Sequence, residues 1–414
     1  SLVFAATALV AFNPAFLFVT TGVTNDALLF ALSTWAYVLM VQLVLRGGDS
    51  EPTRASWALV LLLGVTLGLS ALTKQSALAL LPVAALAVIW GTRGQAQPRR
   101  AAVLWLLLLV GVIALLAGWW YLNNTLAYGD PLGFQPHQTP EGDWRPSPIQ
   151  IIRQLGQALK GYWAVFGWGL IEVEPMLYVI IALFSLEGLA ALFFSLLSGR
   201  LCSGSSVTCR ILAVVGFGVL LNLLGMLLWL WRTSAPYGRL LYPTLGPVAV
   251  LLVLGWQHWL GRRHHRLFAW VITLTLGLFA VSVPWRYLRP AYADPVVSAP
   301  DAENTMPVDV RFANDLRLIG YRMEPQDAKP GECTNFTLYW QATREIDAPL
   351  TVFVQLAPND PEQHVASIND YLGGSHYPSD VWQPDETIRQ VHRLQLPDDM
   401  PVPGVYWFTV GLYE

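Results

Sequence analysis

Apolar residues fill most of the first 290 positions, in uncharged runs that short polar connectors separate. A membrane-spanning helix needs roughly 17 to 25 predominantly apolar residues, and about nine runs approach or reach this length. They cover residues 2–20, 27–45, 57–73, 77–91, 101–121, 176–197, 211–231, 240–260 and 267–285. The pattern therefore predicts a multi-pass α-helical membrane domain over residues 1–290, with about nine transmembrane helices.

Arginine residues distinguish the two sides of this membrane domain, because they fall in alternate connectors. These connectors carry Arg46 and Arg54, then Arg93, Arg99 and Arg100, then Arg200 and Arg210, then Arg262, Arg263 and Arg266. By the positive-inside rule, arginine-rich connectors face the cytoplasm. The remaining connectors, among them the long loop 122–175, and the segment after residue 286 are then extracytoplasmic.

The composition changes after the last apolar run, where residues 291–306 are polar and rich in proline and form the expected linker. Over residues 307–414, apolar positions alternate with period 2, which is typical of half-buried strands. The strand candidates are 310–322, 336–340, 350–356, 387–396 and 404–413. We expect an extracytoplasmic β-sandwich, in which the aromatic residues Tyr339, Trp382 and Tyr406 either pack in the core or stack on sugar rings.

Composition supports a membrane protein and argues against several other classes. The chain is 54% hydrophobic and only 13% charged, and it contains 18 tryptophans. The net charge of −3 comes without a basic patch, so nucleic acid is not an expected partner. We find no phosphate-binding loop, dinucleotide fingerprint or zinc spacing. Soluble nucleotide cofactors are therefore unsupported, and a divalent metal ion is the one cofactor left open. Cys202 and Cys209, in a connector assigned to the cytoplasm, are expected to be free thiols.

Three candidate residues lie at predicted outer helix ends. Asp26, preceded by Asn25, begins the second apolar run, where a carboxylate can cap the helix. It can equally face a polar site at the membrane boundary, with Asp26 supporting catalysis and Asn25 holding a sugar or acceptor. Lys74 is a lone cation between two apolar runs. It either extends toward lipid headgroups or neutralises a phosphate whose lipid tail stays in the bilayer.

The connector 232–242 places guanidinium groups beside phenols, through Arg232, Tyr237, Arg239 and Tyr242. Arginine can hold phosphate oxygens with two parallel hydrogen bonds, and tyrosine can add another. Interfacial anchoring is the alternative for these residues. Arg239 is the strongest single candidate for binding a lipid phosphate.

The predicted outer loop also contributes carboxylates. Asp130, Glu172 and Glu174 are candidates for sugar or acceptor binding, although their spacing is not that of a metal site and solvation is the alternative. Glu187 differs, because it lies near the middle of a predicted span. An ionisable residue there is functional, or it is protonated or paired inside the helix bundle.

Five segments together resemble the bacterial family 39 membrane glycosyltransferases, members of the GT-C superfamily that includes protein mannosyltransferases and the aminoarabinose transferase of lipid A. The segments are FNPAFLFVTTGVTNDALL, LGLSALTKQSALALLP, AGWWYLNNTLAYGDPLG, YWAVFGWGLIEVE and YGRLLYPTLGPVAVLL, within residues 1–290. The later segments TLYWQA, TVFVQLA, SDVWQPDE and GVYWFTVGLYE are similar to the extracytoplasmic β-domain that some of these enzymes carry.

The resemblance implies a hexosyl or pentosyl transferase of the bacterial plasma membrane. Such an enzyme moves a sugar from a polyprenyl-phosphate carrier to a hydroxyl of a glycan, lipid or protein on the outer face, with inversion. The family's general base lies in an acidic loop expected upstream of Ser1. The chain starts without methionine and stops at Glu414 directly after a strand-like stretch. We therefore expect a fragment, truncated within the β-domain and inactive by itself.

Two other functions remain as alternatives. A transporter or flippase of lipid-linked glycan would need polar residues along a path through both leaflets, whereas the candidates here gather on one predicted side. A non-catalytic membrane anchor that presents a sugar-binding domain would be favoured if the upstream sequence lacked an acidic outer loop.

Overall fold

The computed structural model contains two compact units, Ser1–Arg289 and Pro290–Glu414. We describe each unit by itself. The structure describes residues 2–414 except for positions 52, 134–145, 170, 200, 202–204, 234, 261, 301–304, 313–315, 359–363, 398, 399, 401 and 403.

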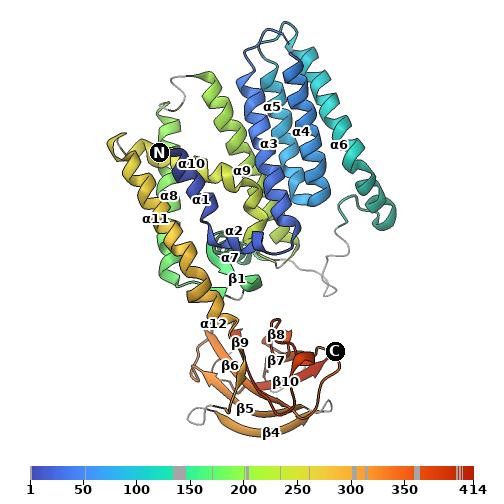
Figure 1. The fold of residues 1–414 in the computed structure, drawn as a ribbon, viewed down its shortest axis with the longest axis vertical. Coiled ribbons are helices and arrows are strands. Elements are labelled where there is room, and N and C mark those ends of the chain that lie inside the picture. Colours follow the sequence, from blue (N-terminus) through green and yellow to red (C-terminus); the bar gives the residue numbers. More distant parts are fainter. Residues whose placement is uncertain are drawn as a thin grey trace. The chain divides into compact units, whose positions relative to one another are not determined.

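The first unit is almost entirely helical (Figure 1). Its longer helices are α1 (Leu2–Ala11), α2 (Pro14–Thr21), α3 (Asn25–Leu45), α4 (Arg54–Thr73), α5 (Leu80–Gly91), α6 (Pro98–Tyr128), α7 (Pro148–Ala164), α8 (Pro175–Leu197), α9 (Ser206–Arg232), α10 (Leu245–Trp259) and α11 (His265–Val283). Shorter helical turns are η1 (Gln75–Ala79), η4 (Gly238–Thr244), η5 (Arg262–His264), η6 (Pro284–Leu288) and α12 (Arg289–Ala291), and β1 (Val165–Phe166) pairs with β2 (Ile171–Glu172) around η3 (Gly167–Gly169).

Seven helical segments in the described residues are long and apolar enough to cross a membrane. Their outer faces stay apolar and exposed, as at Trp270, Leu274 and Leu278 of α11. Exposed hydrophobic side chains over whole helices are costly in water and suit a lipid environment. At the level of fold class, the prediction of a helical membrane protein followed by a β domain is confirmed.

Two of the nine predicted spans differ from the expectation. The run 2–20 is two helices that meet at an angle of 51°, because Pro14 cannot continue the backbone hydrogen bonds of α1. Asn13 instead caps α2, and its side-chain oxygen accepts a hydrogen bond from Phe16 N at 2.9 Å. The run 77–91 lies in the shorter apolar helix Gln75–Gly91, whose first turn is a 3-10 helix.

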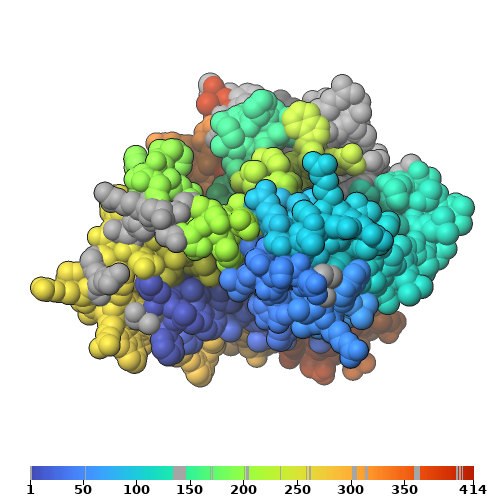
Figure 2. All heavy atoms as spheres, turned by 90° about the horizontal axis from the view of Figure 1, so that it is seen from above, coloured from blue at the N-terminus to red at the C-terminus, as the bar shows by residue number. Residues whose placement is uncertain are grey.

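The arginine-rich connectors after α3 and after α5 lie at the opposite end of the helical unit from the start of α3. The connector after α3 and the connector after α5 are joined by hydrogen bonds from Gly94 N to Gly47 O (2.8 Å) and from Ala96 N to Ser50 O (3.2 Å). Figure 2 looks onto this end. Because α3 has 21 residues, its first turn, which contains Asp26, lies about 30 Å from the connector at its other end. This distance is the thickness of a bilayer core.

One prediction about cysteine is wrong. Cys209 is disulfide-bonded, whereas the sequence analysis expects a free thiol; Cys202 lies outside the described residues. The expectation relied on the redox compartment alone. Bond formation also depends on how closely the fold brings two sulfur atoms together, and spacing along the chain does not determine that distance. Cys333, in the second unit, is free.

The second unit consists of two antiparallel sheets around one hydrophobic core (Figure 1). The strands are β3 (Val296–Val297), β4 (Met306–Phe312), β5 (Leu316–Glu324), β6 (Cys333–Ala342), β7 (Thr351–Ala357), β8 (Ala366–Tyr371), β9 (Thr387–Gln395) and β10 (Trp407–Tyr413). A five-stranded sheet has the order β3-β9-β6-β5-β4, and a three-stranded sheet has the order β10-β7-β8. Leu338 and Trp340 of the first sheet meet Val352 and Val354 of the second sheet in the shared core.

Period-2 patterns located most of these strands, with some differences. The predicted strand 310–322 is formed by parts of β4 and β5, which pair with each other. Val296 and Val297, in the expected linker, pair with β9, and β8 was not predicted. The aromatic residues Tyr339 and Trp382 are buried, so these two side chains pack in the core.

His392 is a buried titratable group in this core. It lies on the inward face of β9 and is 1% exposed, and within the described part of the chain neither ring nitrogen has a hydrogen-bond partner. Burial lowers its pKa from 6.5 to about 4, because the charged imidazolium is poorly solvated there. Between these values the unfolded chain binds a proton that the folded chain does not, so stability rises with pH.

Acidification from pH 7 to about 4.5 is therefore expected to cost this unit about 2 kcal/mol through His392. Hydrogen exchange of β6 and β9 amides, corrected for intrinsic rates, measures the change. The His392→Phe variant should lose most of this acid sensitivity, and the exposed His376→Phe variant should keep it. Burial raises the pKa of Asp370, so acidification stabilises the folded unit through this carboxyl group. This opposing contribution is present in both histidine variants. Equal pH profiles for the two histidine variants would contradict the assignment.

Candidate functional site

Asp26 is the centre of a buried charge cluster at one end of the helical unit. It lies in the first turn of α3, where the helix dipole favours a carboxylate, and it is 2% exposed. Its Oδ1 accepts a hydrogen bond from Lys74 Nζ at 2.5 Å. Lys74 is the extended residue between α4 and η1, so its side chain joins the end of one span to the start of another.

Arg239 completes the cluster from a third segment. Its Nε lies 3.6 Å from Asp26 Oδ2, and its guanidinium stands over the ring of Tyr237 at 4.9 Å from the centroid. Together the three charged side chains carry one net positive charge, since one carboxylate faces two cations. The fold thus brings together Asp26, Lys74 and Arg239, which are far apart in the sequence.

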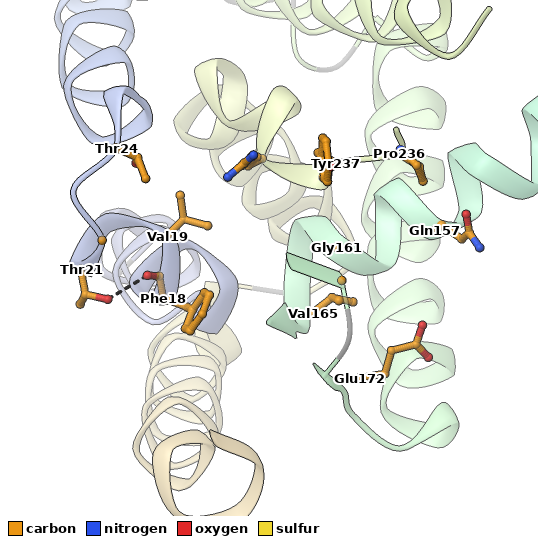
Figure 3. Close-up of a pocket in the computed structure, with 14 residues that line it drawn as sticks. Phe18, Val19, Thr21, Thr24, Gln157, Gly161, Val165, Glu172, Pro236 and Tyr237 are labelled. Atoms are coloured by element: carbon orange, nitrogen blue, oxygen red, sulfur yellow. Dashed lines mark hydrogen bonds between the residues drawn. The ribbon is translucent and has the colours of Figure 1, made fainter. Parts of the chain in front are cut away.

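A cavity of about 460 Å³ lies beside Arg239, within the size range of small-molecule sites. Figure 3 shows Phe18, Val19 and Thr24 on one side, with Gly161 and Tyr237 on the other. Arg239, Tyr237 and Glu172 are among its lining residues, whereas Asp26 and Lys74 are not. Asp26 and Lys74 therefore support Arg239 from behind the wall of the cavity.

Two other predicted residues have structural contacts near this cluster. Asn25 donates a hydrogen bond from Nδ2 to the carbonyl oxygen of Thr73 at 3.0 Å, which ties the start of α3 to the end of α4. Tyr242 is 2% exposed, and its hydroxyl donates to the carbonyl oxygen of Tyr162 at 3.3 Å. It packs against Phe30 in the core and does not line the cavity.

The predicted loop residues are distributed around the same end of the unit. Glu172 lines the cavity and pairs with Lys160 at 3.4 Å. Asp130 forms a turn in which its Oδ1 accepts a hydrogen bond from Leu132 N at 2.9 Å. Arg232 is the exposed last residue of α9. Asp130 and Arg232 are not among the residues that line the cavity.

Glu174 forms a separate contact with the end of the last span. It accepts hydrogen bonds from the Tyr287 hydroxyl and from Arg286, the latter at 2.5 Å. The hydrogen bond from Tyr287, together with the contact from Arg286, lowers the pKa of Glu174. Sequence reasoning missed Arg286 and Tyr287, although a basic residue and a phenol at the end of an apolar run are an available signal.

Gly238 and Gly161 were also missed, and they position the cavity wall. The two glycine backbones touch: a Cβ on Gly238 would lie 2.1 Å from Tyr162 N and 2.3 Å from Gly161 C. This close approach places η4, with Arg239, directly on α7. No local sequence signal could identify the contact, because its partners are separated by more than 70 positions.

Glu187 is exposed on the surface of α8, so it does not pair inside the bundle as one alternative suggests. Among the described residues, no group of three or more histidine, cysteine, aspartate or glutamate side chains is arranged to hold a metal ion. The loop 122–175 also contains the carboxylates Glu141 and Asp143, which lie outside the described residues.

The arrangement can bind an anion beside an apolar surface. A guanidinium forms strong, directional hydrogen bonds to phosphate and carboxylate oxygens, and a phenol beside it supplies a further donor. Phe18, Val19 and Val165 offer apolar contacts in the same cavity. The chain matches no protein-family model, and neither a curated protein nor a solved structure shows significant similarity to it.

Proposed function

We propose that this chain belongs to a membrane glycosyltransferase of the GT-C type, which takes a sugar from a polyprenyl-phosphate carrier. The observation that carries the proposal is the position of Arg239, on a cavity at the ends of apolar helices and backed by Asp26 and Lys74. A polyprenyl-phosphate sugar has an apolar tail and an anionic headgroup. Its headgroup would therefore lie where apolar helices end and a cation is held.

The proposed orientation places this site outside the cytoplasm. The arginine-rich connectors after α3 and after α5 lie at the other end of the helical unit, and such connectors face the cytoplasm by the positive-inside rule. The site end would then face the extracytoplasmic side of the bacterial plasma membrane. Acceptors on that side include hydroxyl groups of glycans, lipids and proteins.

In the proposed reaction, the bond between the anomeric carbon and the phosphate oxygen breaks, and its electron pair leaves with the phosphate. The acceptor oxygen forms a bond to the same carbon with inversion, and the acceptor hydroxyl gives its proton to a general base. Negative charge then builds on the departing phosphate. A cation already in place stabilises that charge, and such electrostatic stabilisation is often the largest contribution to catalysis. Asp26 holds Arg239 and Lys74 in position, so their side chains need little reorganisation when the phosphate departs.

The distribution of candidate residues supports transfer over transport. Asp26, Lys74, Arg239 and the cavity lie together at one end of the unit. A carrier that moves a headgroup across both leaflets needs polar residues along the whole path. Glu187, the acidic residue near the middle of α8, is exposed on the outside of the described unit rather than directed into it.

Binding of undecaprenyl phosphate to the purified chain in detergent tests the site without requiring turnover. Loss of a charge-assisted hydrogen bond costs about 1.5–3 kcal/mol, so Arg239→Gln should weaken binding roughly 10- to 100-fold. The control is Arg100→Gln, an exposed arginine at the opposite end, which should bind as the wild type does. Equal affinity of Arg239→Gln and wild type would refute the phosphate site.

A further inference from the structure

The helix α7 has an apolar stripe that no described part of the helical unit covers. Ile149, Ile152 and Leu159 are 63%, 65% and 47% exposed. At 3.6 residues per turn, these three side chains fall within an arc of about 80°. Residues of another face, including Ala158 and Tyr162, are buried against the unit. The helix is therefore amphipathic, with one apolar surface packed and a second one exposed.

Contacts of α7 place it level with the ends of the spanning helices. The carbonyl oxygen of Tyr162 accepts hydrogen bonds from Asn13 Nδ2 at 3.0 Å and from the Tyr242 hydroxyl at 3.3 Å. Tyr242 lies in the first turns of the span Gly238–Gln257 and so marks the end of a span, whereas Asn13 lies at the bend between α1 and α2. The ends of such spans mark the headgroup region of a bilayer.

The cavity lies on the other side of the same helix. Gln157 and Gly161 are among its lining residues. On a helix of 3.6 residues per turn, these two positions point, on average, about 150° around the helix axis from the exposed stripe. Thus α7 contributes to the wall of the cavity through one side and carries the exposed apolar stripe on another side.

Charge beside the stripe identifies what covers it. Arg153 and Lys160 follow Ile152 and Leu159 directly, so they lie along one border of the stripe. Lys160 is 42% exposed although it pairs with Glu172 at 3.4 Å. Long basic side chains beside an apolar surface reach anionic headgroups while their stems stay on the acyl boundary. Burial of each exposed isoleucine or leucine in that layer gains about 1.5–3 kcal/mol.

We propose that α7 lies in the interfacial layer of the membrane, with Ile149, Ile152 and Leu159 inserted at the acyl boundary and Arg153 and Lys160 at the phosphates. The bilayer surface then holds one wall of the cavity at headgroup depth. This inference depends only on the membrane location of the helical unit. It is independent of which reaction the cavity supports.

Spin-label accessibility tests the position of α7 in the complete chain, reconstituted in vesicles that contain anionic lipid. Nitroxides are attached at Ile152→Cys and Leu159→Cys, with Gln157→Cys as the matched control on the other side of the helix. Cys333→Ser removes the described free thiol in all three variants. We expect the ratio of oxygen to water-soluble nickel-chelate collisions to be several-fold higher at positions 152 and 159 than at 157.

Two outcomes would overturn the proposal. Equal ratios at all three positions would show that the stripe faces water. Low collision rates with both reagents at positions 152 and 159 would show that protein covers the stripe instead of lipid. Wild-type thermal unfolding in each labelled variant establishes that the labels report on the folded chain.

Discussion

The Lys74→Met variant is expected to lose about 3 kcal/mol of unfolding free energy, because it removes the closest partner of a buried carboxylate. Asp26 is 2% exposed, Lys74 Nζ lies 2.5 Å from its Oδ1, and Arg239 Nε is more distant at 3.6 Å. Without Lys74, the carboxylate stays desolvated while only the weaker ion pair remains. Denaturant unfolding in mixed detergent micelles measures the loss.

An exposed ion pair provides the matched control. Lys160 and Glu172 lie 3.4 Å apart, with side chains 42% and 34% exposed, and exposed pairs contribute about 0–1 kcal/mol. Lys160→Met should therefore leave stability nearly unchanged. The double variant Asp26→Asn and Lys74→Met should recover most of the stability lost in Lys74→Met, since neither charge remains buried. A Lys74→Met variant as stable as Lys160→Met would contradict a structural role for this pair.

The double variant also separates support from ligand binding. Arg239 lines the cavity and Lys74 does not, so a folded double variant, which keeps the guanidinium but loses its Asp26 partner, should bind undecaprenyl phosphate more tightly than Arg239→Gln does. Reduced activity in Lys74→Met alone would not identify a phosphate ligand, because loss of stability produces the same result.

The Gly238→Ala variant should lose about 3 kcal/mol of stability and most of its binding of undecaprenyl phosphate, because strong overpacking costs this much. A Cβ there would lie 2.1 Å from Tyr162 N, 2.3 Å from Gly161 C and 2.4 Å from Ala158 O. All three are backbone atoms of α7, so no side-chain rotation relieves the clash. Either η4 or α7 must move, and Arg239 moves with η4.

Gly246→Ala is the control for this substitution. Gly246 lies in α10 of the same span, and a Cβ there would have no heavy atom within 4 Å. Alanine is favoured over glycine inside a helix by about 1 kcal/mol, so this variant should be as stable as wild type or more stable. Denaturant unfolding and undecaprenyl phosphate binding are measured on both variants. If Gly238→Ala and Gly246→Ala behave alike, the close contact of η4 with α7 does not position Arg239.

Local patterns predicted the elements of both units well. A span depends on the length and polarity of one continuous segment, and a half-buried strand depends on alternation within a few residues. Both signals are local, which explains why α3, α4, β6 and β9 fall near their predicted positions. The bend at Pro14 was predictable from the same local chemistry, since proline lacks an amide hydrogen.

The candidate site was only partly predictable. Asp26, Lys74 and Arg239 are each conspicuous, because a charge at the end of an apolar run requires an explanation. Arg232 carries the same signal, and the phenol of Tyr242 lies in the same connector, but neither residue lines the cavity. Tyr242 lies one turn deeper than Arg239, where Phe16 and Phe30 surround it. Exposure of a side chain depends on its neighbours in space, so position along the chain could not distinguish these residues.

The sequence by itself determined the apolar spans, the alternation of arginine between connectors, the β-rich second unit and the charged residues at the helix ends. The tertiary structure decided which of those charges meet, since Asp26 and Lys74 are 48 positions apart and come from different spans. It also decided that Gly238 contacts α7 and that Arg239 lines a cavity. Hydrophobicity and helix ends are properties of neighbouring residues in the chain, whereas an ion pair or a cavity exists only after distant segments have packed.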